Sequence, residues 1–198
     1  MNLPNKLTLS RAIATPVFMA LMLLTAIPFN YTLALFLFIA ASITDLFDGK
    51  IARERNIVTN FGKFLDPIAD KMLTTAAFLG FIVIMPNDNF AAQVTVMTFI
   101  VIFREFIVAS VRLIAASGER KKVIAANMWG KLKTVTQMIC IISGLTAYSV
   151  SEILPDIKIL FDILLITFLV IGWVSVLFTV ISGIIYVHES RDLIDNTK

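Results

Sequence analysis

The chain alternates long apolar runs with short polar connections. The apolar runs cover residues 12–28, 31–48, 67–85, 91–116, 132–151 and 158–186. A helix needs about 20 mostly apolar residues to cross the hydrocarbon core of a bilayer, so this pattern predicts six transmembrane helices. Pro28, Pro86 and Pro155 mark the turns that join successive pairs of runs. The sixth run is long enough to tilt in the bilayer or to extend beyond it.

The composition agrees with a membrane protein. Hydrophobic residues make up 58% of the 198 positions and charged residues only 16%, with a mean hydropathy of +0.88. Soluble domains have roughly 45–50% apolar and about 25% charged residues. We therefore predict an all-α membrane protein in which residues 1–198 form one six-span domain. Residues 1–11 are expected to form a short juxtamembrane segment along the bilayer surface.

The two edges of the predicted bundle differ in their content of basic residues. The connections at 29–30, 86–90 and 152–157 contain no Lys or Arg, and Lys158 is the only basic residue at that edge. The opposite edge holds Lys6, Arg11, Lys50, Arg53, Arg55, Lys63, Lys71, Arg120, Lys121, Lys122, Lys131, Lys133, Arg191 and Lys198. The positive-inside rule places this edge and both termini in the cytoplasm. Nucleic-acid binding is not expected, because these charges are spread over several helix ends without interleaved aromatic residues.

Two pairs of aspartates lie at matched positions on the second and third predicted spans. Asp45 and Asp48 follow fourteen uncharged residues, and Asp66 and Asp70 lie just ahead of another fourteen, from Met72 onward. At about 1.5 Å per residue, each uncharged stretch covers about 21 Å of a core about 30 Å thick. The two pairs are therefore expected at similar depth, somewhat below the cytoplasmic surface. Antiparallel packing of the two spans would bring the pairs together.

Four converging carboxylates indicate a site for divalent cations. The spacings i,i+3 and i,i+4 place each pair on one helix face, and a carboxylate inside a membrane needs a compensating charge. Oxygen ligands alone suit Mg²⁺, Mn²⁺ or Ca²⁺, and zinc is disfavoured because His and Cys are absent nearby. In the alternative interpretation the aspartates cap helices and pair with Lys50, Arg53, Lys63 and Lys71.

The same stretch carries a fixed pattern, D-x-x-D-G-x-x-A-R, then eight residues, then G-x-x-x-D-x-x-x-D. Its positions are Asp45, Asp48, Gly49, Ala52, Arg53, Gly62, Asp66 and Asp70. The pattern resembles the signature of the CDP-alcohol phosphotransferases without a departure. The segments "NLPNKLTLSR" at 2–11, "GKFLDPIADK" at 62–71, "REF" at 104–106 and "GKLKT" at 130–134 look like the bacterial phosphatidylglycerophosphate synthase branch of that family.

This resemblance implies a reaction and roles for the matching residues. The expected enzyme transfers a phosphatidyl group from CDP-diacylglycerol to sn-glycerol 3-phosphate and releases CMP. All four aspartates would hold two Mg²⁺ or Mn²⁺ ions, and Asp70 would also act as general base. The nucleotide site would contain Gly49, Ala52, Arg53 and Gly62, with Asn5 and Thr8 as hydrogen-bonding candidates. The resemblance further implies a homodimer in the bacterial inner membrane with its active site toward the cytoplasm. The mostly apolar third and fourth spans are candidates for the dimer interface.

The non-reacting phosphate of glycerol 3-phosphate needs cations near Asp70. The candidates are Arg104, Arg112, Lys131 and Lys133, with Arg11 and Arg191 behind them. Arg104 lies in the middle of a predicted span, where an arginine is a functional-site candidate by default. Alternatively, Arg104 forms an internal ion pair with one of the aspartates, since the adjacent Glu105 is expected to point elsewhere around the helix. Arg112 can also extend to the membrane surface, and topology alone could explain the two lysines.

Other functions remain open at this stage. The metal pattern cannot separate glycerol 3-phosphate from other acceptors, namely inositol phosphate, serine or phosphatidylglycerol. A small cation transporter would use the carboxylates as an ion site, but such sites lie near the bilayer midplane, often with inverted repeats. These aspartates lie toward one face, and no internal repeat is visible. A purely structural scaffold gives no reason for four clustered carboxylates.

Overall fold

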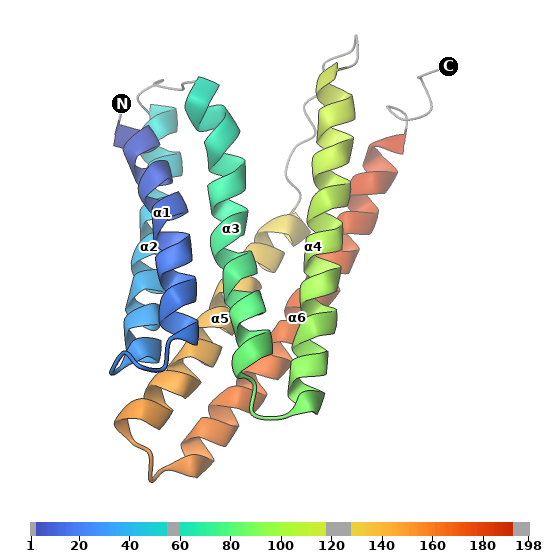
Figure 1. Cartoon of the computed structure of the whole chain (residues 1–198). Coiled ribbons are helices and arrows are strands. Elements are labelled where there is room, and N and C mark those ends of the chain that lie inside the picture. Colours follow the sequence, from blue (N-terminus) through green and yellow to red (C-terminus); the bar gives the residue numbers. More distant parts are fainter. Residues whose placement is uncertain (1–2, 55–59, 118–127, 192–198) are drawn as a thin grey trace.

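The computed structural model describes residues 3–54, 60–117 and 128–191. Within these ranges, the side chains of residues 3, 4, 6, 45–54, 60–67, 70 and 114–117 lie outside the description. The described residues form six helices (Figure 1). The helices are α1 (Leu3–Leu23), α2 (Asn30–Glu54), α3 (Asn60–Ile84), α4 (Asp88–Ser117), α5 (Met128–Ile153) and α6 (Lys158–Glu189). Each helix overlaps one of the six predicted apolar runs, which confirms the all-α fold.

The first helix differs from the prediction at both ends. Instead of a separate surface segment, residues 3–11 form the first turns of α1 itself, and the helix ends at Leu23 rather than at Pro28. Pro4 does not prevent this early start, because a proline in the first helical turn removes an N–H group that has no intrahelical partner. The residues that precede Arg11 therefore belong to the same continuous helix as the apolar residues that follow it.

Asparagine side chains at two of the connections form hydrogen bonds with backbone groups at the helix ends. The Nδ2 atom of Asn30 donates a hydrogen bond of 2.8 Å to the carbonyl oxygen of Leu21, near the end of α1. The backbone N–H of Phe90 donates to Oδ1 of Asn87 at 2.9 Å, just ahead of the start of α4. Both bonds satisfy backbone groups that a helix end leaves without an intrahelical partner.

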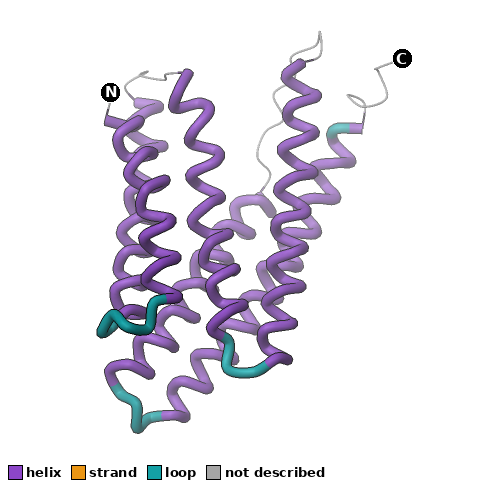
Figure 2. The backbone as a smooth tube through the Cα atoms, in the orientation of Figure 1, coloured by secondary structure: helices purple, strands orange, loops and turns teal. Residues whose placement is uncertain are grey.

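The helices form two groups, α1–α3 and α4–α6, which contact each other where α3 meets α4 and α5 and where α2 meets α5. Helix α1 packs against both α2 and α3, and α5 packs along α6. Helix α4 contacts both α3 and α6, which joins the two groups. The α1–α2, α3–α4 and α5–α6 turns lie at one end of the bundle (Figure 2). The start of α1, the end of α2 and the start of α3 lie together at the opposite end, as the predicted two-edged layout requires.

Aromatic rings fill the junction between the two groups. The ring centroids of Phe81 and Phe168 are 4.6 Å apart, and Gly144 on α5 faces both rings. A Cβ atom at Gly144 would lie 2.6 Å from Phe81 Cζ and 2.7 Å from Phe168 Cδ2. Because this glycine has no side chain, rings from α3 and α6 can meet against the α5 backbone, a use of small residues common in membrane helix packing.

The outside of the bundle is apolar, as a lipid-embedded surface requires. Exposed large hydrophobic side chains include Val83, Phe99, Phe106, Leu113 and Ile159. Within the described residues, three segments are long and apolar enough to cross a membrane by themselves: Asp88–Leu113, Met128–Ile153 and Lys158–Glu189. Shorter apolar segments of the described part are Leu7–Leu23, Asn30–Thr44 and Lys71–Ile84.

A carboxylate from α5 caps the start of α2. Glu152 accepts hydrogen bonds from the backbone N–H of Tyr31 at 2.9 Å and of Thr32 at 3.0 Å. Its Oε2 atom also accepts a bond of 2.8 Å from Oγ1 of Thr32. The first N–H groups of a helix lack intrahelical partners and carry the positive end of the helix dipole, so a carboxylate is well suited to this position. Glu152 thereby fixes the beginning of the aspartate-bearing helix to α5.

We predict that Glu152→Ala lowers the free energy of unfolding by about 1–3 kcal/mol, because two partly buried backbone N–H donors lose their acceptor. Thermal unfolding in detergent measures the change. The matched control is Asp156→Ala, which removes an exposed acid from the connection that follows α5 and should change the stability by less than about 0.5 kcal/mol. Equal losses in the two variants would contradict the capping role.

Candidate active site

The four aspartates lie on helical backbone at the ends of α2 and α3. Asp45 and Asp48 belong to the last part of α2, and Asp66 and Asp70 to the first part of α3. The helical assignment preserves the i,i+3 and i,i+4 spacings that place each pair on one face. The side chains of all four lie outside the described residues. Their role as metal ligands and the role of Asp70 as general base therefore stay predictions.

The candidates for the nucleotide site gather at the same end of the bundle. Gly49, Ala52 and Arg53 continue the helical path of α2, and Gly62 lies in the first turn of α3. Their side-chain environments also lie outside the described residues. Asn5 and Thr8 are buried in the first turns of α1, the helix that packs against both α2 and α3. The backbone thus places the six candidates on three adjoining helix ends.

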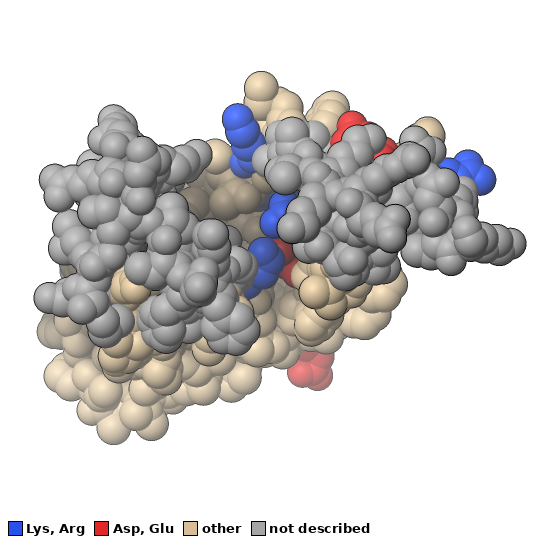
Figure 3. All heavy atoms as spheres, turned by 90° about the horizontal axis from the view of Figure 1, so that it is seen from above, with Lys and Arg blue, Asp and Glu red and all other residues tan. Residues whose placement is uncertain are grey.

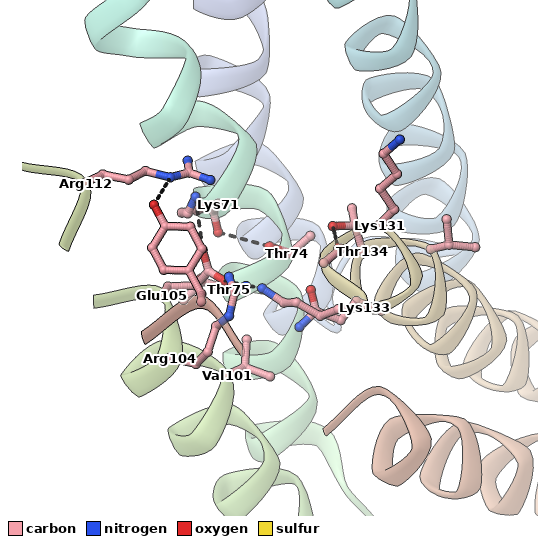
Figure 4. Close-up of a pocket in the computed structure, with 14 residues that line it drawn as sticks. Lys71, Thr74, Thr75, Val101, Arg104, Glu105, Arg112, Lys131, Lys133 and Thr134 are labelled. Carbon is pink, nitrogen blue, oxygen red and sulfur yellow. Dashed lines mark hydrogen bonds and ion pairs between the residues drawn. The ribbon is translucent and has the colours of Figure 1, made fainter. Parts of the chain in front are cut away.

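A polar cavity of about 440 Å³ lies between α3, α4, α5 and α6 (Figure 4). Its lining includes Lys71, Thr74 and Thr75 from α3, Val101, Arg104, Glu105 and Arg112 from α4, Gly130, Lys131, Lys133, Thr134, Val135 and Gln137 from α5, and Tyr186 from α6. All four predicted acceptor residues are in this set. Side chains far apart in the sequence thus line one cavity, and their role in binding the acceptor phosphate stays a prediction.

One carboxylate lies at the centre of the cationic side chains. Glu105 Oε1 accepts from Arg104 Nη1 at 3.0 Å and also from Nζ of Lys133, and its Oε2 atom is 3.0 Å from Nζ of Lys71. The expectation that Glu105 points away from Arg104 was wrong. The side chains of neighbouring residues leave a helix in different directions. The arginine side chain is nevertheless long enough to bend back to the adjacent carboxylate. The internal ion pair of Arg104 is therefore with Glu105 in the described structure.

One serine hydroxyl and one tyrosine hydroxyl of α6 accept hydrogen bonds from the two arginines of α4. Arg104 Nη2 donates to Oγ of Ser182 at 3.1 Å, and Arg112 Nε donates to the hydroxyl oxygen of Tyr186 at 3.3 Å. The guanidinium of Arg112 also lies over the Tyr186 ring, 5.7 Å from its centroid, within the range of a cation–π interaction. Arg112 therefore turns inward to the cavity instead of extending only to the membrane surface.

The two lysines of α5 differ in direction. Lys133 is buried and points to Glu105, whereas Lys131 is exposed and extends away from that cluster (Figure 4). Since residues two apart on a helix lie on different faces, only one of the pair can point straight at the cluster. Lys133 is thus part of the cavity interior, and Lys131 contributes positive charge from its margin.

Sequence reasoning missed three participants in this cavity. Lys71 was predicted as a residue of the basic edge or a partner of the aspartates and not as part of the acceptor site, although it directly follows Asp70. Glu105 is an acidic residue within a span, which is in itself a signal of function. Gln137 is 4% exposed, lines the cavity one helical turn beyond Lys133, and its Nε2 atom has no hydrogen-bond partner in the structure. Its i,i+4 spacing from Lys133 was a signal that could have found it.

The electrostatics of the cavity favour an anion. Among the residues whose side chains the structure describes, five cationic side chains and one carboxylate line it. Viewed from the end where α1 begins, Lys and Arg side chains border a hollow in the molecular surface (Figure 3). Lys71 joins this cavity to the aspartate-bearing part of α3, because it is the next residue after Asp70. An anion bound here would lie beside a helix end rich in carboxylates, an arrangement suited to an acceptor with a phosphate at one end and a reacting group at the other.

Comparison with known proteins identifies the family of this chain. The sequence model of the CDP-alcohol phosphatidyltransferases matches residues 1–181. The chain belongs to this family. A protein of Bacillus subtilis strain 168, named a CDP-diacylglycerol--glycerol-3-phosphate 3-phosphatidyltransferase, is 41% identical over 210 residues, which cover all of this chain and 99% of the relative.

Two further relatives carry the same name. That of Haemophilus influenzae strain Rd is 33% identical and covers all of this chain and 98% of its own length. That of Rickettsia bellii strain RML369-C is 35% identical and covers 93% of each chain. In this CDP-alcohol phosphatidyltransferase, the α2–α3 segment that carries the aspartate pattern and the α3–α6 cavity both lie largely within the matched region.

We predict that Glu105→Gln lowers the free energy of unfolding of this phosphatidyltransferase by about 3 kcal/mol. Removing one partner of a buried charge cluster leaves the others uncompensated, and here three cations lose a shared carboxylate. Denaturant unfolding in mixed micelles gives the value.

The matched control for this substitution is Glu189→Gln, an isosteric change of an exposed glutamate at the end of α6. Its stability should stay within about 0.5 kcal/mol of the parent protein. A Glu105→Gln variant as stable as this control would show that the cations do not depend on the carboxylate.

Proposed function

We propose that this chain transfers the phosphatidyl group of CDP-diacylglycerol to sn-glycerol 3-phosphate, producing phosphatidylglycerol phosphate and CMP. The observation that carries the proposal is the cationic cavity beside Asp70, in a chain that matches relatives of that name along their whole length. A dianionic phosphate suits five cationic side chains, and the adjoining aspartates suit a metal-dependent phosphoryl transfer.

The donor site is assigned to the aspartate-bearing ends of α2 and α3. Asp45, Asp48, Asp66 and Asp70 offer only hard oxygen ligands, a donor set that fits Mg²⁺ or Mn²⁺. Such ions would neutralise negative charge on the pyrophosphate and on departing CMP. The remaining candidates, Asn5 and Thr8 from α1 with Gly49, Ala52, Arg53 and Gly62, would hold the nucleotide. The acyl chains of the donor can stay in lipid because the site lies near the end of apolar helices.

The acceptor site is assigned to the cavity. The non-reacting phosphate of glycerol 3-phosphate would contact Arg112, Lys133 and Lys71, with Arg104 held beneath by Ser182 and Glu105. The terminal hydroxyl would then extend along α3 toward Asp70. Asp70 would take the hydroxyl proton as the oxygen attacks the β-phosphorus, and the bond from that phosphorus to CMP would break. Lys131, at the margin, would attract the acceptor by charge.

The charge of the cavity also separates the alternatives. Serine has no phosphate, and phosphatidylglycerol has a single phosphodiester charge, so neither matches the cationic lining as well as a phosphomonoester. Inositol phosphate has the same phosphate chemistry and remains the alternative acceptor. Cation transport is disfavoured, because five cationic side chains would repel a cation from the cavity.

Membrane orientation and assembly complete the proposal. The basic residues at the aspartate-bearing end indicate that this end faces the cytoplasm of a bacterial inner membrane. A homodimer could form through the exposed apolar faces of α3 and α4, which present Leu79, Val83, Phe99 and Phe106.

The direct test measures CMP release by the purified protein. CDP-diacylglycerol and Mg²⁺ or Mn²⁺ are supplied with glycerol 3-phosphate, inositol phosphate, serine or phosphatidylglycerol. We expect release with glycerol 3-phosphate, its loss on chelation of the metal, and its return when either ion is added back. If none of the four acceptors supports metal-dependent CMP release, the transferase assignment is refuted. If another acceptor is preferred, only the assignment of glycerol 3-phosphate is refuted.

We predict that Asp70→Asn lowers the turnover number by at least about 100-fold, because general-base catalysis alone contributes about 10²–10⁴. Binding of CDP-diacylglycerol should remain measurable by equilibrium titration. Asp162→Asn, an exposed substitution near the other end of the bundle on α6, should keep normal turnover. Near-normal rates for Asp70→Asn would exclude it as the base.

We predict that Arg112→Ala raises the KM for glycerol 3-phosphate by roughly ten- to hundredfold, the effect of losing a hydrogen bond to a charged group. The KM for CDP-diacylglycerol should change less than about twofold. Steady-state kinetics with each substrate varied in turn separates the two. A change confined to the donor would place the phosphate elsewhere.

A further inference from the structure

A second cavity lies on the outside of the bundle between α4 and α6. It has a volume of about 640 Å³ and is lined by Ile100, Phe103, Arg104, Ile107, Val180, Gly183, Ile184, Val187, His188 and Arg191. We name it the α4/α6 groove. Its wall residues Phe103 and Ile184 are 56% and 65% exposed, so the groove faces the surroundings of the bundle. Among the described lining residues, Arg104 is the one that the groove shares with the acceptor cavity.

The glycine in α6 makes room for this shared residue. A Cβ atom at Gly183 would lie 3.1 Å from Cγ of Arg104, closer than ordinary contact. The Arg104 guanidinium turns inward to Glu105 and Ser182. The groove is therefore bordered by the methylene stem of Arg104 and stays apolar along most of its length.

The lining of the groove changes from apolar to polar at one end. His188 and Arg191 are three residues apart on the last turn of α6 and its continuation, where both side chains are exposed. From Val180 to Arg191 the helix path covers about 16 Å at about 1.5 Å per residue, which is comparable to much of an acyl chain. An apolar trough that ends in a guanidinium and an imidazole group, both able to donate hydrogen bonds, is complementary to an amphiphile with one apolar chain and an anionic head. Basic pockets between membrane helices bind lipid head groups by this chemistry.

The position of the groove separates it from the donor site. The reacting pyrophosphate of the donor is assigned to aspartates on α2 and α3, whereas α4 and α6 alone line this groove. We infer that the α4/α6 groove binds one acyl chain of an anionic phospholipid other than the two substrates, with the lipid phosphate at Arg191 and His188.

Native mass spectrometry of the full chain tests this inference. The protein is loaded with equal amounts of phosphatidylglycerol and phosphatidylcholine that have identical acyl chains. We expect one tightly retained phosphatidylglycerol. One cation near a membrane surface contributes about 1 kcal/mol, so Arg191→Gln should lower the retained ratio of phosphatidylglycerol to phosphatidylcholine about fivefold. The control Lys158→Gln, at the opposite edge, should leave the ratio unchanged.

A second pair of variants tests the apolar part. Val180→Trp fills the groove and should lower lipid retention at least about fivefold, whereas Val170→Trp lies on an exposed face of the same helix outside the groove and should not. Equal retention of the two lipids, or equal behaviour of the two tryptophan variants, would overturn the inference. Displacement by inorganic phosphate would indicate a simple anion site, and displacement by CDP-diacylglycerol would indicate the donor's own site. Loss of a dimer in Val180→Trp with unchanged lipid preference would assign the groove to a second copy of the chain.

Discussion

The interior of this membrane protein depends on the carboxylate of Glu105. It bonds cations contributed by α3, α4 and α5, and among the described lining residues of the cavity it is the one acidic side chain beside five basic ones. A charged residue at the centre of a membrane helix costs about 2.5–3.5 kcal/mol on insertion scales. By sharing one carboxylate, Lys71, Arg104 and Lys133 are held in fixed positions while the cavity keeps an excess of positive charge. A preorganised cationic surface of this kind can bind a phosphate without first ordering flexible side chains.

Helix α3 links the two chemical halves of the proposed reaction. Its first part carries Asp66 and Asp70, and Lys71 begins the part that lines the cavity. Helices α1 and α2 adjoin the acidic part, while α4, α5 and α6 surround the basic part. Neighbouring residues on one rigid helix thus set the spacing between donor chemistry and acceptor binding. This explains why the sequence pattern of the family is concentrated at the end of α2 and the start of α3.

The sequence predicted those features that depend on a few strong constraints. Six apolar runs predicted six helices because the length of a span is fixed by the bilayer, and the gathering of Arg104, Arg112 and Lys133 followed from the cost of isolated charges in lipid. The pairing of Arg104 with Glu105 was not predictable from helical spacing, because a long side chain can bend around the helix. Lys71 was not singled out, because the positive-inside rule already accounts for a basic residue at that edge. The α4/α6 groove depends on contact between Gly183 and Arg104, residues 79 positions apart, and no local pattern marks such a contact.

The cap at Glu152 has a mechanical consequence for α2, the helix that carries Asp45 and Asp48. Helix α2 is anchored to α5 at Tyr31 and Thr32, whereas Asp45 and Asp48 lie about 20 Å further along the same rod, at about 1.5 Å per residue. If α2 moves as a rigid body about this fixed end, the displacement of a residue grows with its distance from the cap. A change in the tilt of the helix would therefore move Asp45 and Asp48 further than it moves Tyr31 and Thr32.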